Sequence, residues 1–316
     1  MKRGTRSKLF SSWQDASIVR KLPFAFSALL TALVGVFVYT AYHGVKQKAY
    51  DAVTERLDRV GTEIAEIGAA NRVGRAALFD RTVRRPAIEA AIAGDLSHRP
   101  DTVLTRLRVG SDSSAILLLD RDRRVIAQAG NPLSTNASQH LSRIVNDARE
   151  MRDTYAVGQI FEDGGRAFYW QGYAIRRGSD VVGYIAQLRR MGSAPTSTAA
   201  LEELIGDATV LVANADDFTT PWVRLDGRLV EPPTEPHAQR GTHRHSRGET
   251  RALAYTVQIA GTPWMVVTET SESVVNERAF RFLRQTAPIA VALILLGVLI
   301  SWLISRKVTL PMRDLA

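Results

Sequence analysis

Cysteine is absent from all 316 residues of the sequence. Its absence excludes disulfide bonds, thiolate metal sites and cysteine nucleophiles, so any domain in the chain depends on an ordinary apolar core. The sequence also lacks an HExxH zinc motif, a phosphate-binding glycine loop and a Gly-x-Ser-x-Gly elbow. We therefore predict no catalytic site and no cofactor in this segment.

Fixed charges are missing from two long runs, residues 22–45 and 285–305, and most of the residues in both runs are apolar. A helix that crosses roughly 30 Å of hydrocarbon needs about 20 such residues. We predict transmembrane helices at residues 22–43 and 286–304. A cleaved secretion signal is the alternative for the first run, but signal cores are shorter, at about 7 to 15 apolar residues.

Positive charge is concentrated before the first apolar run. Six basic residues against one acidic residue, Asp15, place residues 1–21 in the cytoplasm by the positive-inside bias; they are Lys2, Arg3, Arg6, Lys8, Arg20 and Lys21. We therefore expect residues 44–285 to lie on the exported side of the membrane, between the two spans of a multi-pass protein. The formal net charge is +9. Because much of the basic excess lies beside the membrane, we expect contact with membrane lipid and no nucleic-acid partner.

The exported segment begins with a helical pattern over residues 44–80. Six apolar residues recur there at spacings of three and four: Tyr50, Val53, Leu57, Val60, Ile64 and Ile67. This seam fits a helix packed on its own domain, and it also fits the stalk of a homodimer. The pattern is too short to separate the two, so both remain open.

Two sets of strand patterns follow the helix. Residues 81–191 contain a helix opened by Pro86 and two predicted hairpins, which pair 115–119 with 125–129 and 168–175 with 181–188. After a linker, residues 199–270 repeat this order with a short helix at 199–205 and strands at 209–213, 252–259 and 264–268. Residues 216–247 are polar and rich in proline. The fold class is α+β: two transmembrane helices flank a long helix and two tandem antiparallel-sheet modules.

The order of these segments resembles a known receptor architecture. The resemblance rests on three segments: residues 115–127 (AILLLDRDRRVIA), 181–188 (VVGYIAQL) and 261–269 (GTPWMVVTE). Taken in this order, the chain resembles a bacterial transmembrane receptor with a double Cache sensor domain. The resemblance implies two PAS-like modules, membrane-distal at 81–191 and membrane-proximal at 199–270. It also implies a homodimer that binds a small-molecule ligand or a protein partner in the periplasm.

Residues 305–316 resemble the start of a HAMP linker. The segment SRKVTLPMRDL carries Pro311 and, four residues later, Leu315, which match the proline and leucine of the first HAMP helix. The resemblance implies that these two residues relay a signal from the second transmembrane helix to an output module beyond residue 316. That module could be a histidine kinase of a two-component system, a nucleotide cyclase, a phosphatase or a chemotaxis signalling rod.

One group of side chains could bind a ligand: Arg166, Phe168, Tyr169, Trp170 and Tyr173. A guanidinium can bind a carboxylate through two hydrogen bonds, and aromatic rings can wall a small pocket. Arg166, Phe168 and Tyr169 resemble the Arg-x-Trp-Tyr element of amino-acid-binding double Cache domains, although Phe168 replaces the tryptophan and Gln171 stands where an acidic residue would bind the ligand's amine. The alternative is that Phe168 and Trp170 fill the core and Arg166 lies in a solvated turn.

Three histidines, His237, His243 and His245, have a spacing that could suit a metal ion on one strand face. Arg240, Arg244 and Arg247 are interleaved with them, and cationic neighbours disfavour another cation. We predict a solvated segment here and no metal.

The function that fits these patterns is transmembrane signal transduction by a sensory receptor. A membrane-anchored protein whose exported domain binds or assembles with a partner, without signalling output, is the main alternative. A tethered exported hydrolase would need a clustered acid, base or metal site, and the sequence does not show one.

Overall fold

The computed structural model describes residues 18–95, 97, 99–108, 113–150, 155–192, 205, 208–233, 240–248 and 250–313. The chain divides into two compact units. Residues 53–272 form one, called here the exported unit after its predicted location, and residues 1–52 with 273–316 form the other. Helix α2 (Ile18–Val83) contributes to both units.

The second unit consists of the N-terminal part of α2 and helix α7 (Glu272–Arg313). Both helices are long and apolar enough to cross a membrane, with windows of mean hydropathy 2.0 and 2.3 that are not buried by other parts of the chain. Their large apolar side chains are exposed, for example Leu33 at 64% and Leu295 at 64%. The predicted α+β class is confirmed, with two apolar helices that flank a long helix and two antiparallel sheets.

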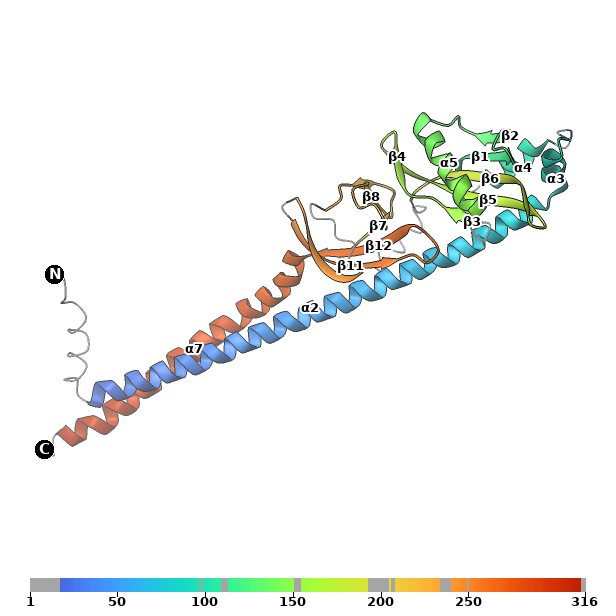
Figure 1. Cartoon of the computed structure of the whole chain (residues 1–316). Helices are drawn as coiled ribbons and strands as arrows, with labels where there is room; N and C mark the ends of the chain where they lie inside the picture. Colours follow the sequence, from blue (N-terminus) through green and yellow to red (C-terminus); the bar gives the residue numbers. More distant parts are fainter. Residues whose placement is uncertain are drawn as a thin grey trace, which may run out of the picture. The chain divides into compact units, whose positions relative to one another are not determined.

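The first module of the exported unit is one antiparallel sheet with three short helices (Figure 1). Strand order is β2-β1-β6-β5-β3, and β4 also pairs with β5. The elements are α3 (Pro86–Ile92), α4 (Pro100–Arg108), β1 (Ser113–Asp120), β2 (Val125–Gly130), α5 (Thr135–Glu150), β3 (Tyr155–Val157), β4 (Phe161–Asp163), β5 (Arg166–Arg177) and β6 (Asp180–Arg190). Both predicted hairpins are therefore present, with β1 paired to β2 and β5 paired to β6.

Both faces of this sheet are covered, because successive side chains of a strand point to opposite sides. One face packs against α5 through a wholly apolar cluster that includes Leu117, Ile144 and Trp170. The other face shares a cluster with α2, to which Phe79 and Ile185 belong. The first module thus has two separate cores on the two sides of one sheet.

The second module is a six-stranded antiparallel sheet of order β10-β11-β12-β7-β8-β9. Its strands are β7 (Thr209–Asn214), β8 (Trp222–Arg224), β9 (Leu229–Val230), β10 (Gly241–Arg247), β11 (Thr250–Gln258) and β12 (Trp264–Ser271). The strands predicted at 209–213, 252–259 and 264–268 are present. The polar segment 216–247 also supplies β8, β9 and β10, which its composition did not indicate. The helix predicted at residues 199–205 lies outside the described residues except for Ile205.

The apolar seam of α2 packs on the chain's own sheet. Leu57, Val60 and Ile64 are buried, whereas Ile67 is 46% exposed. The hydroxyl of Thr268 on β12 donates to the carbonyl of Leu57 over 2.9 Å. Packing on its own domain therefore accounts for this part of the seam, and the homodimer stays a prediction.

Two glycines on α2 allow this close packing. A Cβ atom at Gly61 would lie 3.1 Å from the ring of Tyr255, and one at Gly68 would lie 3.0 Å from the side chain of Ile259. Both distances are tighter than ordinary carbon contacts, so a larger residue would push the helix away from the second module. The two glycines hold α2 close to the sheet.

Candidate functional site

Successive side chains of β5 point to opposite faces of the sheet, so the five residues predicted to bind a ligand do not all lie on one side. Arg166, Phe168 and Trp170 belong to the side of the sheet that faces α5, and Tyr169 and Tyr173 belong to the side that faces α2. Trp170 is 1% exposed and its indole N–H donates to the carbonyl of Ala137 over 2.9 Å, while Arg166 is exposed at the start of the strand. The structure therefore does not bring the five side chains into one pocket.

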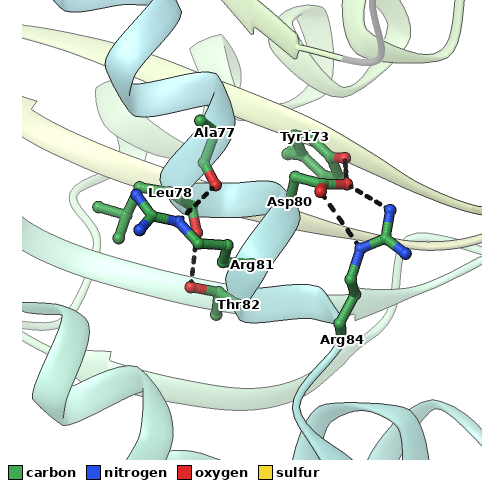
Figure 2. A network of polar contacts seen from close by, with 7 residues as sticks. All are labelled: Ala77, Leu78, Asp80, Arg81, Thr82, Arg84 and Tyr173. Atoms are coloured by element: carbon green, nitrogen blue, oxygen red, sulfur yellow. Dashed lines mark hydrogen bonds and ion pairs between the residues drawn. The ribbon is translucent and has the colours of Figure 1, made fainter.

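Tyr173 is engaged in a contact with the end of α2. Its hydroxyl donates to Oδ1 of Asp80 over 3.0 Å, and Arg84 donates to both oxygens of the same carboxylate over 3.2 Å (Figure 2). The hydrogen bond from Arg84, followed by that from Tyr173, holds the pKa of Asp80 below its ordinary value. Tyr173 also stacks on Phe79, with ring centroids 6.0 Å apart. These contacts fasten α2 to the first sheet.

Tyr169, by contrast, lines a cavity of about 240 Å³ inside the exported unit. Its walls come from α2, from β3, β5 and β6 of the first module, and from β7, β8 and β12 of the second. The ring of Trp264 on β12 meets Tyr169 edge-on, with centroids 4.7 Å apart. The cavity thus lies where three parts of the exported unit converge.

Arginine is the prevalent charged residue around this cavity. Five arginines line it: Arg72, Arg75, Arg189, Arg190 and Arg224. Among the described residues that line it, none is Asp or Glu. All formal charges on the described lining side chains are therefore positive.

Arg189 is the most buried of the five arginines, and its hydrogen bonding is incomplete. Its side chain projects from β6 beside Tyr169, and the residue is 6% exposed. Its Nε and Nη1 atoms have no hydrogen-bond partner within the described part of the chain. Burial of a guanidinium without full pairing destabilises a fold, so the position calls for a physical reason.

Neutral polar groups accompany the arginines. Gln171, 3% exposed, donates to the hydroxyl of Tyr169 over 3.4 Å, and its Oε1 has no partner among the described residues. Tyr155 is fully buried, and its hydroxyl likewise lacks a partner within the described ranges. Burial raises the pKa of Tyr155, so the phenol keeps its proton and acts as a hydrogen-bond donor.

The two modules are joined close to this cavity. Asn214, the last residue of β7, accepts from the backbone N–H of Ile160 over 2.8 Å and donates to the carbonyl of Ile160 over 2.9 Å. The indole N–H of Trp264 donates to the carbonyl of Gly158 over 3.0 Å. A molecule in the cavity would therefore contact residues adjoining the junction between the modules.

One of the three histidines, His245, takes part in a polar network with Glu269 and Arg247 in the second module. His245 is 6% exposed, and its Nε2 lies 2.9 Å from Oε2 of Glu269. Arg247 binds both oxygens of Glu269 over 2.7 and 3.1 Å and lies over the ring of Trp222. His237 lies outside the described residues, and within those residues no three potential ligands gather in one place.

The two predicted relay residues belong to the C-terminal end of the chain. Pro311 lies within the residue range of α7, and Leu315 lies outside the described residues. Both roles stay predictions.

Sequence reasoning missed Arg189, which follows the apolar run 181–188 and looks like the solvated end of a strand. The alternation of side chains along β6 could have identified it, because this alternation places Ile185, Gln187 and Arg189 on the face opposite α5. Arg72 gave no such signal, since the carbonyl that it contacts belongs to Tyr155, 83 residues further along the chain.

The chain matches no protein-family model, and no curated protein matches it. Solved structures do match. The ligand-binding domain of the Pseudomonas fluorescens chemoreceptor CtaA, in complex with L-isoleucine, is 12% identical, with a TM-score of 0.50 over 76% of this chain and 99% of that one. Its complex with L-serine gives 14% identity and a TM-score of 0.50 over 71% and 99% of the two chains. The exported unit has the fold of these Cache-type sensor domains.

Proposed function

We propose that this chain, whose exported unit has the fold of chemoreceptor ligand-binding domains, is the sensory part of a bacterial transmembrane receptor. A small molecule binds residues 44–285 outside the membrane, and the change passes through residues 286–304 to the cytoplasm. The single observation that supports this most is the cavity walled by α2 and by both modules. A pocket with buried polar groups at such a junction is a natural site for a ligand that shifts the arrangement of its walls.

The connection between cavity and membrane helix is short. Trp264 lines the cavity and begins β12, which ends at Ser271, and α7 begins at the next residue, Glu272. Arg244 of β10 binds the Glu272 carboxylate, with Nε 2.9 Å from Oε1. Since no loop intervenes between the strand and the helix, a displacement of β12 is transmitted to the start of α7.

The finer assignments belong to the same proposal. The membrane is the bacterial inner membrane, the receptor is a homodimer, and residues 305–316 begin a HAMP linker in which Pro311 and Leu315 relay the movement. The output module is a histidine kinase, a nucleotide cyclase or a chemotaxis signalling rod. The alternative of an anchored binding protein has the same topology but transmits nothing along α7.

Topology can be tested with single cysteines, because an introduced cysteine is the only thiol in the chain. Ser179→Cys lies in the exposed turn between β5 and β6, and Ser7→Cys lies in the N-terminal tail. We expect an impermeant maleimide to label Ser179→Cys in spheroplasts and to label Ser7→Cys only after the membrane is permeabilised. The reverse pattern would overturn the assigned orientation.

Signalling can be tested without knowing the ligand. Residues 1–313 are fused to the HAMP linker and kinase of a characterised receptor, and reporter expression is measured. Asn214→Ala and Trp264→Ala, which loosen the module junction, should change output at least threefold, whereas the exposed Ser179→Ala should not. If membrane-inserted hybrids give the same output for all variants, the anchored binding protein is the better description.

A further inference from the structure

We propose that the arginine-lined cavity binds a small organic anion, with a carboxylate or phosphate on the guanidinium of Arg189 and no ammonium group. The proposal rests on the proposed function in one respect: the anion would be the cue that the receptor detects. Of the five residues suggested by the sequence, this site includes only Tyr169, while Arg166 belongs to the opposite face of the same sheet.

The charge of the cavity is the first argument. Five arginines line the walls, and no acidic residue does so among those that the structure describes. A guanidinium binds a carboxylate or phosphate through two parallel hydrogen bonds, and this pairing is strongest where water is excluded. An anion in the cavity would therefore meet cationic walls, with no acidic side chain among the described lining residues to repel it.

The state of Arg189 is the second argument. The residue is 6% exposed and lines the cavity, and its Nε and Nη1 atoms find no hydrogen-bond partner in the described ranges. Buried polar groups in folded proteins are almost always paired, and a buried cation is costly without a counter-charge. A bound anion gives this arrangement a reason that packing alone does not supply.

Two uncharged groups add directional hydrogen bonds. The Tyr155 hydroxyl is buried and without a partner among the described residues, so an anionic oxygen that reaches it would accept its hydrogen bond. Gln171 Oε1 is in the same state and accepts only, which suits a hydroxyl or a protonated oxygen of the ligand. These two groups favour a ligand that carries an acceptor and a donor.

Size and wall chemistry limit the ligand further. At roughly 30 Å³ per water, 240 Å³ corresponds to about eight water volumes, which suits a small metabolite and excludes a folded peptide. Tyr169, Trp264 and Val212 supply apolar walls for its uncharged part. A free amino acid would need an acidic group for its ammonium, and no described lining residue is acidic.

The test uses the full chain in lipid nanodiscs. Binding of succinate, benzoate, inorganic phosphate, L-isoleucine and benzylamine is measured by calorimetry on the native chain, on Arg189→Gln and on Arg166→Gln. We expect at least one anion to bind the native chain, and Arg189→Gln to weaken it at least tenfold. Arg166→Gln, an exposed arginine on the neighbouring strand, should change affinity less than twofold. Benzylamine should not bind.

The same titrations separate the possible anions. Stronger binding of succinate or benzoate assigns the site to carboxylates, and stronger binding of phosphate assigns it to phosphorylated molecules. No binding by any anion, tighter binding of L-isoleucine than of every anion, or loss of binding in Arg166→Gln alone would each overturn the proposal.

Folding of the variant is checked by its unfolding temperature without ligand. Loss of an uncompensated buried cation should leave that temperature unchanged or raise it in Arg189→Gln. A clear decrease would assign Arg189 a structural partner and contradict the proposal. Arg224→Gln, at a more exposed position of the same wall, provides a second variant, expected to weaken anion binding at least threefold.

The hybrid reporter separates this inference from the receptor function. Anion binding that depends on Arg189 but leaves reporter output unchanged would support the site and oppose the receptor. Output that responds to Asn214→Ala while no anion binds would support the receptor and oppose the site.

Discussion

The two faces of the first sheet are built from the same strands but packed in opposite ways. On the side of the sheet that faces α5, a continuous apolar core is filled by side chains such as Trp170, Leu117 and Ile144. Toward α2, the sheet has apolar packing at Tyr173 and Phe79 but also borders a cavity lined by arginines. The first face is filled by apolar side chains, whereas the second retains buried polar groups that a stability-driven design would remove. The anion site proposed above belongs to the second face.

The largest effect should come from the apolar face. Trp170→Ala removes the largest fully buried side chain and its hydrogen bond to Ala137, so we expect a loss of about 3 to 5 kcal/mol in the free energy of unfolding. Urea unfolding followed by circular dichroism measures this. Val125→Ala, at a position 52% exposed, is the control and should change stability by less than about 0.5 kcal/mol. Equal effects for the two variants would remove the distinction between core and surface.

A smaller effect is expected where the modules meet. Asn214→Ala leaves the N–H and the carbonyl of Ile160 without their partner, which costs about 1 to 3 kcal/mol for buried groups. Hydrogen exchange of the Ile160 amide should accelerate together with the drop in stability. Asn136→Ala, which removes a single exposed bond to the carbonyl of Glu162, should cost less. An unchanged exchange rate at Ile160 would contradict the assigned junction.

On the α2 face, Tyr173→Phe should lower stability by at most about 1 kcal/mol, because the Asp80 side chain is 43% exposed and solvent screens it. The folded-state pKa of Asp80 is lowered, so this contribution is present above the carboxyl's unfolded pKa and disappears as the pH falls through the folded value. The stability difference between native chain and variant should therefore shrink below about pH 4. A difference that grows with acidity would reverse this assignment.

The smallest effect should come from Arg166→Gln. The residue is exposed at the start of β5, so we expect a change within about 0.5 kcal/mol in thermal unfolding. A loss comparable to that of Trp170→Ala would show that the two faces of the sheet do not differ as described.

Strands with an apolar, β-branched pattern could be predicted from the sequence. Both hairpins of the first module appear at the expected positions because each has a turn between two apolar runs. Strands β8, β9 and β10 could not be predicted in this way. Strand β10 (GTHRHSR), for example, lies at the edge of its sheet and buries only His245. Edge strands that bury little carry little apolar signal.

The candidate site was harder to predict than the fold. The aromatic group around Trp170 was conspicuous in sequence, but period-two alternation sends its members to different faces. The cavity joins Arg72 on α2 with Tyr155, Arg189 and Trp264, which are brought together only by tertiary packing. Glycines at positions 61 and 68 set how close α2 lies to the second module, and a sequence pattern does not reveal which side chain each one meets.

The Asn214 amide has a further consequence for motion within the exported unit. Its oxygen accepts from Ile160 and its nitrogen donates to the same residue, so one rigid planar group holds both hydrogen bonds. Hydrogen bonds weaken steeply with misalignment, and a shift of about 1 Å or a tilt of the amide would break both bonds together. We therefore expect the two hydrogen bonds to be lost together when the modules separate at this residue.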